Sequence, residues 1–101
     1  MDAEYRAYLD ENIRLIILKA LAAESNASLN DYAIEKALEE FGYNKTREYI
    51  RNQISWLETE ASAVRTRSPG TAIIATLTKA GRDHLERRRF LVGVQRPSDV
   101  E

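Results

Sequence analysis

The sequence predicts a small, mainly α-helical domain with one β-hairpin in its C-terminal half. Apolar residues recur at helical spacing in three consecutive segments between residues 5 and 61. Two short stretches rich in Val, Ile and Thr then flank Ser-Pro-Gly at 68–70, as in a hairpin. A chain of 101 residues is long enough for one domain with a single core.

The first helix is expected to begin after Asp2, which can accept hydrogen bonds as an N-cap. One apolar stripe comprises Tyr5, Leu9, Ile13, Ile16, Ile17 and Ala20, and the opposite side carries Tyr8, Leu15, Leu18 and Ala22. A helix that is apolar on two sides is buried on two sides. It therefore lies at the centre of the domain or against a partner subunit. We expect the second arrangement, a homodimer whose interface includes Tyr8, Leu15, Leu18, Phe90 and Leu91.

The second helix is expected to follow the polar break "SNAS". Ser28 is the predicted N-cap, with Asp31 three residues later in a weak form of the capping box. The expected buried side comprises Leu29, Tyr32, Ala33, Ala37, Leu38 and Phe41. Gly42 is suited to end this helix.

The third helix is expected to begin after Thr46, another good N-cap, and to have two different sides. Its inner stripe is formed by Ile50, Ile54, Leu57 and Ala61, with Trp56 beside it in the core. Its outer side is centred on Arg51 and Ser55 and includes Asn52, with Arg47 at the margin. This outer side is available to a ligand.

The remaining elements are predicted to be two strands, "AVRTR" and "TAIIATL", and a last helix after Thr78. Pro69 followed by Gly70 suits a type II turn, because proline presets the first central residue and glycine accepts positive φ at the second. Residues 90–101 lack a helical period, so we divide the chain into a domain at 1–89 and a C-terminal tail at 90–101. The apolar start of the tail indicates that it packs against something.

Composition excludes several classes of site. The chain has no cysteine and only one histidine, His84, so thiolate chemistry and a histidine metal cluster are excluded. Its longest aliphatic run, "LIIL", is far shorter than the roughly 20 residues of a membrane span. No serine lies in a glycine-framed nucleophile turn, and "SPGT" is too short to hold phosphate as a Gly-rich loop. We therefore expect a cytoplasmic protein that is not an enzyme, with no cofactor, metal or membrane partner.

The net charge of −1 conceals an asymmetry along the chain. Residues 1–42 carry nine acidic and four basic side chains, whereas residues 43–101 carry seven acidic and eleven basic ones. The first part is thus net −5 and the second net +4. Such separation permits one positive surface on a protein that is weakly acidic as a whole.

The order of helix, helix, helix, hairpin and helix is that of a winged helix-turn-helix domain, with a three-helix core, a two-stranded wing and a C-terminal helix. In "REYIRNQISWLE" and "ATLTKAGRDHLE" the chain resembles winged-helix DNA-binding proteins, including ArsR-like and MarR-like regulators. With the tail "VGVQRPS" it also resembles small ArsR-like proteins of Mu-like phages and prophages. It departs from these families at "EASAV", where a glycine is common. It also lacks the cysteines of metal-sensing members.

The resemblance implies binding of double-stranded DNA and a role as a small transcriptional regulator of phage type. The third helix would then read the major groove through Arg47, Arg51, Asn52 and Ser55. Lys45, Thr46, Arg65 and Arg67 would contact the phosphate backbone from the helix start and the wing. Arg65 and Arg67 have an equally good second interpretation, in which their charges keep an edge strand from pairing with a strand of another protein.

The alternative is a protein-interaction module, in phage assembly or DNA packaging, that keeps the fold without the DNA contacts. Glu48 near the outer side of the third helix and the net charge of −1 favour it. A continuous band of positive surface potential over the third helix and the wing, spanning two subunits about 34 Å apart, favours DNA binding. An acidic interruption of this band favours a protein partner. Arg51 and Asn52 that are occluded, or held by carboxylates at a subunit contact, would count against gene control.

Overall fold

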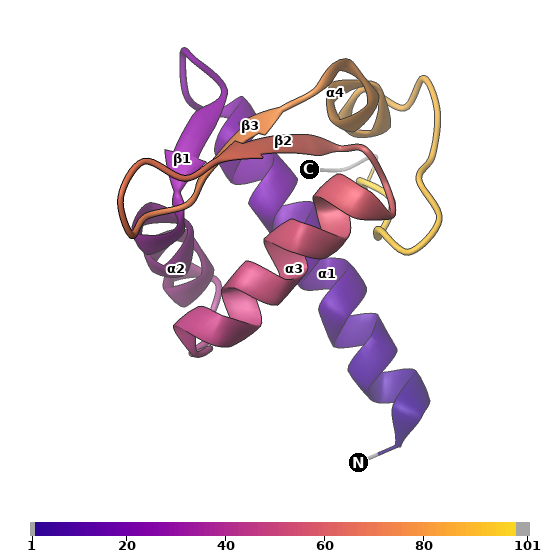
Figure 1. The fold of residues 1–101 in the computed structure, drawn as a ribbon. Helices are drawn as coiled ribbons and strands as arrows, with labels where there is room; N and C mark the ends of the chain where they lie inside the picture. Colours follow the sequence, from indigo (N-terminus) through magenta and orange to yellow (C-terminus); the bar gives the residue numbers. More distant parts are fainter. Residues whose placement is uncertain (1, 99–101) are drawn as a thin grey trace.

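The computed structural model describes residues 2–98, which form a cluster of helices covered on one side by a small sheet (Figure 1). In chain order its elements are α1 (Ala3–Ala22), β1 (Ser28–Asn30), α2 (Asp31–Glu40), α3 (Arg47–Thr59), β2 (Val64–Arg67), β3 (Ile74–Leu77) and α4 (Lys79–Leu85). The three predicted core helices, the hairpin and the last helix are all present. The architecture is thus mixed, with four helices and a three-stranded antiparallel sheet among the described residues.

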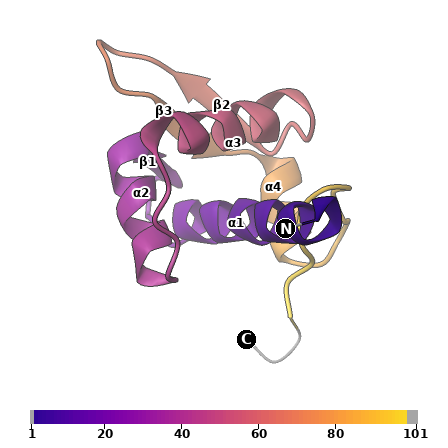
Figure 2. The same ribbon diagram turned by 90° about the horizontal axis from the view of Figure 1, so that it is seen from below.

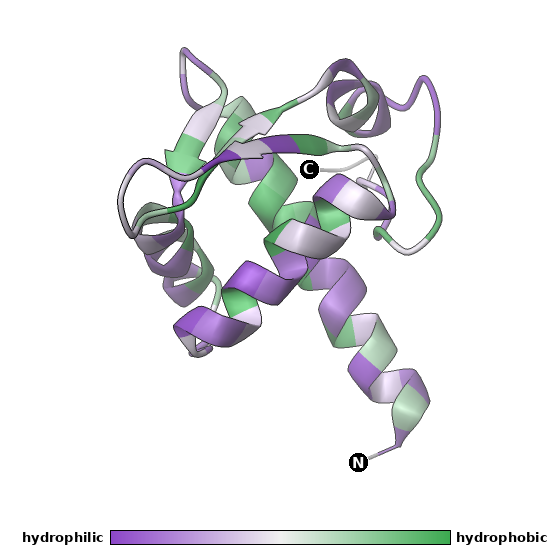
Figure 3. Cartoon of the chain, viewed as in Figure 1, coloured by the Kyte–Doolittle hydropathy of each residue, from purple (hydrophilic) through white to green (hydrophobic). Residues whose placement is uncertain are grey.

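Helix α1 lies at the centre of the domain, between α2, α3, α4 and the sheet (Figures 1 and 2). Its central and C-terminal turns bury apolar side chains on both predicted stripes, including Ile13, Leu15, Ile17 and Leu18. Figure 3 shows the same arrangement by hydropathy, because the apolar stretch of α1 lies inside the fold. The two-sided apolar pattern is therefore satisfied within one chain.

This burial corrects part of the expected dimer interface. Leu15, Leu18 and Leu91 belong to the hydrophobic core of a single chain. They are not accessible to a second subunit, because their surfaces are covered by the other elements of the same molecule. Of the five residues expected at that interface, only Tyr8 and Phe90 are exposed.

Strand β1 replaces the predicted first turn of the second helix. Ser28 pairs with Thr76 and Asn30 with Ile74, so β1 joins β3 to give the strand order β1-β3-β2. The N-cap of α2 is consequently Asn30, whose Oδ1 accepts a hydrogen bond from the N–H of Ala33 at 2.8 Å. The prediction that Ser28 caps this helix was wrong, and Asp31 becomes the first helical residue.

Helix α3 and the hairpin follow the prediction closely. Thr46 caps α3 by accepting a hydrogen bond from the N–H of Tyr49 at 3.1 Å, and Ile50, Ile54 and Leu57 are buried. After α3 the chain reverses through Ser62, whose φ of +52° occupies the left-handed region usually taken by glycine. Ser62 thus takes a conformation that a glycine adopts more readily.

Segment 91–95 packs against the helices through two residues that belong to the same core. Leu91 and Val94 are buried. His84, itself fully buried on α4, contacts both ends of this segment: the N–H of Leu91 donates to Nδ1 at 3.0 Å, and Nε2 lies 2.8 Å from the carbonyl oxygen of Gln95. The apolar start of the tail is thus confirmed as a packing segment. His84 has a structural role that its polar sequence neighbours did not indicate.

Candidate nucleic-acid interface

The outer side of α3 is a polar surface between the α2–α3 connection and the β2–β3 hairpin, for which we keep the name wing as a label. Asn52, Ser55 and Thr59 are exposed there, together with Glu48. Because these residues recur at three or four positions along the helix, they form one strip parallel to its axis. Two of the four predicted recognition residues, Asn52 and Ser55, therefore lie where a ligand can reach them.

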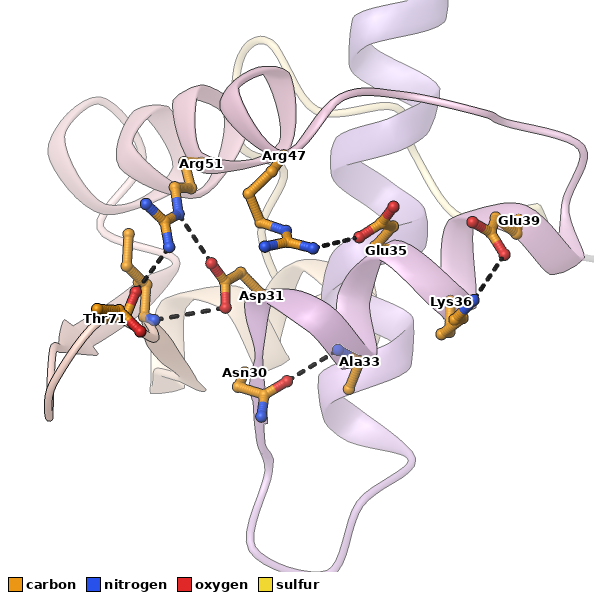
Figure 4. A network of polar contacts seen from close by, with 10 residues as sticks. Asn30, Asp31, Ala33, Glu35, Lys36, Glu39, Arg47, Arg51 and Thr71 are labelled. Atoms are coloured by element: carbon orange, nitrogen blue, oxygen red, sulfur yellow. Dashed lines mark hydrogen bonds and ion pairs between the residues drawn. The ribbon is translucent and has the colours of Figure 1, made fainter.

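Arg51 forms part of the fold at the edge of this strip. Its Nε donates to Oδ2 of Asp31 at 2.8 Å, and its Nη2 donates to the carbonyl oxygen of Thr71 in the wing loop at 2.7 Å (Figure 4). The Asp31 side chain is 0% exposed, whereas that of Arg51 is 37% exposed. Arg51 thus holds the start of α2, the outer side of α3 and the wing together.

Asp31 is held as a carboxylate by these contacts. Burial by itself raises the pKa of Asp31, but hydrogen bonds from Arg51 and from the N–H of Ile73, with the positive charge of Arg51, lower it by more. The net result is a pKa below the ordinary aspartate value. The ion pair is therefore present at neutral pH.

Arg47 is also engaged with α2. Its Nη2 donates to Oε1 of Glu35 at 3.0 Å (Figure 4). Its guanidinium carbon lies 3.6 Å from the ring centroid of Tyr32. The hydrogen bond to Glu35 raises the pKa of Arg47 above its already high ordinary value. About a third of the side chain stays exposed, at 33%.

These pairs limit what the two arginines can offer to a base. Bidentate recognition of guanine requires two free N–H groups of one guanidinium. In Arg51 two of the three guanidinium nitrogens already donate within the protein, so Arg51 is only partly available for a base contact. The pairing was not visible in the sequence because Asp31 and Arg51 are 20 positions apart and meet only when α2 packs on α3.

The predicted contacts at the start of α3 have structural partners as well. Oγ1 of Thr46 serves as the helix cap. The ammonium nitrogen of Lys45 lies 4.8 Å from the ring centroid of Tyr49, and the Lys45 side chain is half-buried. Both residues nevertheless lie at the N-terminal end of α3, where the helix dipole favours an anion.

A second polar surface covers the outer face of the sheet. Arg65 pairs with Thr76 of β3, which pairs on its other side with Ser28. Arg67 pairs with Ile74, which pairs on its other side with Asn30. A cavity of about 400 Å³ is lined here by Arg65, Thr66, Arg67, Thr76, Leu77, Thr78 and Lys79. An adjoining cavity of about 230 Å³ is lined by Asn26, Ser28, Leu29, Asn30, Arg67, Ile74 and Thr76. Sequence analysis identified the two arginines but missed the Ser, Asn and Thr side chains, since β1 was not predicted.

The outer sheet face is the more positive of the two surfaces. No carboxylate lines either cavity. Within residues 2–98, Arg65 and Arg67 form no ion pair, in contrast to Arg47 and Arg51. Their guanidinium groups are exposed and available to an anion.

Two further properties of the described chain bear on function. Across residues 2–98, no group of three or more His, Asp or Glu side chains is placed to hold a metal ion. No helix in this part of the chain is both long enough and apolar enough to cross a membrane.

Comparison with known proteins identifies a phage relative. The chain is 35% identical over 89 residues to the uncharacterized protein gp26 of Escherichia phage Mu, covering 88% of this chain and 91% of gp26. No family model matches the sequence. No solved structure matches it either. The identity and the nearly complete overlap show that this chain belongs to the same protein family as phage Mu gp26.

Proposed function

We propose that the protein binds double-stranded DNA and acts as a small transcriptional regulator of phage type. The observation that carries this proposal is the exposed strip of α3, with the amide of Asn52 and the hydroxyl of Ser55 next to a wing whose arginines are unpaired. A helix fits the major groove, which is about 12 Å wide, and amides and hydroxyls hydrogen-bond to base edges there.

The contacts divide between base edges and phosphates. Asn52 and Ser55 are the base-contacting residues, because their side chains are exposed and Asn pairs with adenine through two hydrogen bonds. Arg51 is a positioning residue, since its bonds to Asp31 and Thr71 hold α3 at a set distance from the wing. Arg65 and Arg67 supply the phosphate contacts, which add salt-dependent affinity without reading sequence.

The test is a salt series with random duplexes and with duplexes enriched by selection, measured by fluorescence anisotropy. Substitution of both Asn52 and Ser55 by Ala is expected to remove the preference for selected duplexes while leaving the affinity for random ones. Substitution of both Arg65 and Arg67 by Ala is expected to weaken binding to all duplexes alike. It should lower the slope of log K against log salt by about 1.8, because each lost phosphate contact removes about 0.9.

Lys36→Ala is the matched control, since Lys36 is an exposed cation on α2 outside both surfaces. It should change neither preference nor slope. A wild-type protein that binds no duplex at low salt, or a double Asn52, Ser55 variant that keeps its preference, would contradict the assignment of α3.

A protein-interaction role in phage assembly or DNA packaging is the second candidate. It is favoured by the carboxylates that neutralise Arg47 and Arg51, and by exposed Glu48 on the same strip. Non-specific DNA affinity comes mainly from phosphate neutralisation, and α3 contributes little to it. This role would be identified instead by three results together. The wild type would bind no duplex, it would retain phage proteins, and substitution of Asn52 and Ser55 would abolish that retention.

A further inference from the structure

The exposed strip of α3 lies directly opposite the buried side of the helix. The buried side comprises Ile50, Gln53, Ile54 and Leu57. The strip comprises Glu48, Asn52, Ser55 and Thr59. At about 100° per residue, every member of the strip lies within about 30° of the direction opposite the buried side. Arg51 and Arg47 lie about 70° and 110° from that direction, on the flank toward α2 (Figure 4). The centre of the strip therefore carries a carboxylate, an amide and two hydroxyls, and no cation.

Glu48 is the member of this strip nearest the start of α3. It is the second residue of the helix and is exposed, and its carboxylate has no hydrogen-bond or ion-pair partner among residues 2–98. On a surface that stays in water, a carboxylate in the first turn simply complements the helix dipole. In a helix-turn-helix complex, however, the N-terminal residues of the recognition helix contact base edges. A carboxylate removed from water there needs a hydrogen-bond donor on the DNA, because burying an unpaired charge is costly.

Only two bases present a hydrogen-bond donor in the major groove. Cytosine presents its N4 amino group, and adenine presents its N6 amino group beside the acceptor N7. Guanine presents the acceptors N7 and O6, and thymine presents the acceptor O4 and a methyl group. An ionised carboxylate accepts hydrogen bonds and donates none, so each of these acceptors repels it. Cytosine is therefore the base whose own groove edge suits Glu48, since it offers a donor without an acceptor.

Asn52 suits a different base, one helical turn further along the strip. Its side-chain amide both donates and accepts, which matches N7 and N6 of adenine. At 1.5 Å per residue, Asn52 lies about 6 Å beyond Glu48 along the helix axis. A duplex rises about 3.4 Å per base pair, so the two side chains reach base pairs one or two steps apart. Because the paired hydrogen bonds of Asn52 fix the position of α3 against the bases, the single contact of Glu48 depends on them.

We propose that the protein selects duplexes in which Glu48 accepts a hydrogen bond from a cytosine, one or two base pairs from an adenine held by Asn52. The inference rests on the proposed function, because it assigns the bases that the strip of α3 reads. The remaining two members of the strip add little discrimination. The hydroxyl of Ser55 can bond to several bases. The hydroxyl of Thr59 already donates to the carbonyl oxygen of Ser55 at 2.9 Å.

The same carboxylate weakens binding to duplexes that lack this cytosine. Where no amino group meets Glu48, its charge stays unpaired and is repelled by base acceptors and phosphates. Such a repulsive contact discriminates against wrong partners as effectively as an attractive contact selects the right one. The attraction to phosphates comes instead from Arg65 and Arg67, which are exposed on β2. Discrimination and general affinity are thus assigned to different elements of the fold.

Selection from a pool of randomised duplexes, followed by fluorescence anisotropy on matched duplexes, tests the role of Glu48. The wild type should select a C·G pair one or two steps from an A·T pair. Replacing that cytosine by thymine should weaken binding about tenfold, because an acceptor takes the place of the donor.

Glu48→Gln should select adenine at this one position, since glutamine pairs with N6 and N7 of adenine. It should keep the adenine contacted by Asn52, and it should bind random duplexes more tightly than the wild type because a negative charge is gone. Glu60→Gln is the matched control. Glu60 is exposed at the C-cap of α3, about 110° from the centre of the strip, so this variant should select the same bases as the wild type.

Selected duplexes with no cytosine within two base pairs of the adenine would overturn the inference. So would a Glu48→Gln variant that selects the same bases as the wild type. Both results leave the proposed function standing, because the wild type would still have selected a duplex. A wild type that binds no duplex would instead overturn the proposed function and this inference together. Circular dichroism should show Glu48→Gln folded, since the side chain is exposed and its size is unchanged.

Discussion

Removal of Arg51 should destabilise the fold before it affects any ligand. In Arg51→Ala the Asp31 carboxylate, 0% exposed, loses its charged partner and keeps backbone hydrogen bonds, including one of 3.5 Å from the N–H of Ile73. Leaving a buried charge unpaired costs about 3–5 kcal/mol. The side chain of Arg51 is 37% exposed, so water reaches this site. The cost of the unpaired charge should therefore lie near the lower end of this range. We expect the free energy of unfolding to fall by about 3 kcal/mol.

Urea unfolding followed by far-UV circular dichroism measures this loss. Arg47→Ala is the matched control, because its partner Glu35 is itself partly exposed and an exposed pair contributes about 1 kcal/mol or less. The double variant Arg51→Met, Asp31→Asn should recover most of the stability, since it removes both charges together. Arg51→Ala within 0.5 kcal/mol of the wild type, or no worse than Arg47→Ala, would refute the role assigned to this ion pair.

The same pair predicts a pH dependence. The pKa of Asp31 is lowered in the folded protein, so its contribution to stability is present above the unfolded pKa and is lost as pH falls through the folded pKa. In Arg51→Ala the unpaired, buried carboxyl should instead have a raised pKa, and protonation relieves it. The difference in unfolding free energy between the wild type and Arg51→Ala should therefore shrink as pH is lowered from 7 into the acidic range where aspartate titrates. A difference that stays constant with pH would contradict this account.

Two further substitutions test how the elements are joined. Gly93→Ala should destabilise the folded protein by about 2–3 kcal/mol, because φ is +90° and an added Cβ would lie 2.5 Å from the ring of Trp56. Thermal unfolding should show a lower melting temperature, and an unchanged melting temperature would contradict the packing of the tail. Glu58→Ala should cost about 1–2 kcal/mol, because the Glu58 carboxylate accepts hydrogen bonds from both the N–H and the hydroxyl of Thr66 at 2.9 and 2.7 Å. Faster amide exchange of Thr66 should accompany that loss, and unaltered exchange would argue against it.

Much of the fold was accessible from local signals. Thr46 and Thr78 were predicted as caps, and each accepts the expected backbone hydrogen bond. The Pro-Gly turn is present, with φ of +69° at Gly70. These features depend on hydrogen bonds and dihedral preferences within a few residues, which neighbouring residue types determine. The exposed positions of Asn52 and Ser55 followed from the same helical period that buried Ile50 and Ile54.

The missed features all depend on residues distant in the chain. Strand β1 has three residues and pairs with β3 more than 40 positions later, so its sequence carried only the local signal of a cap. The salt bridge between Asp31 and Arg51 decides whether the arginine is free, and it exists only because α2 packs on α3.

By itself, the sequence determined the helices, the caps of α1, α3 and α4, the hairpin and the polar side of α3, because short-range periodicity and turn chemistry specify each of them. Only the tertiary structure decided what covers each apolar surface. Leu15 and Leu18 have the same pattern whether a partner subunit or the same chain buries them, and here the chain's own sheet, helices and tail do so. Burial depends on which segments meet in space, and hydrophobic contact is not directional, so the pattern of one helix does not specify its neighbour.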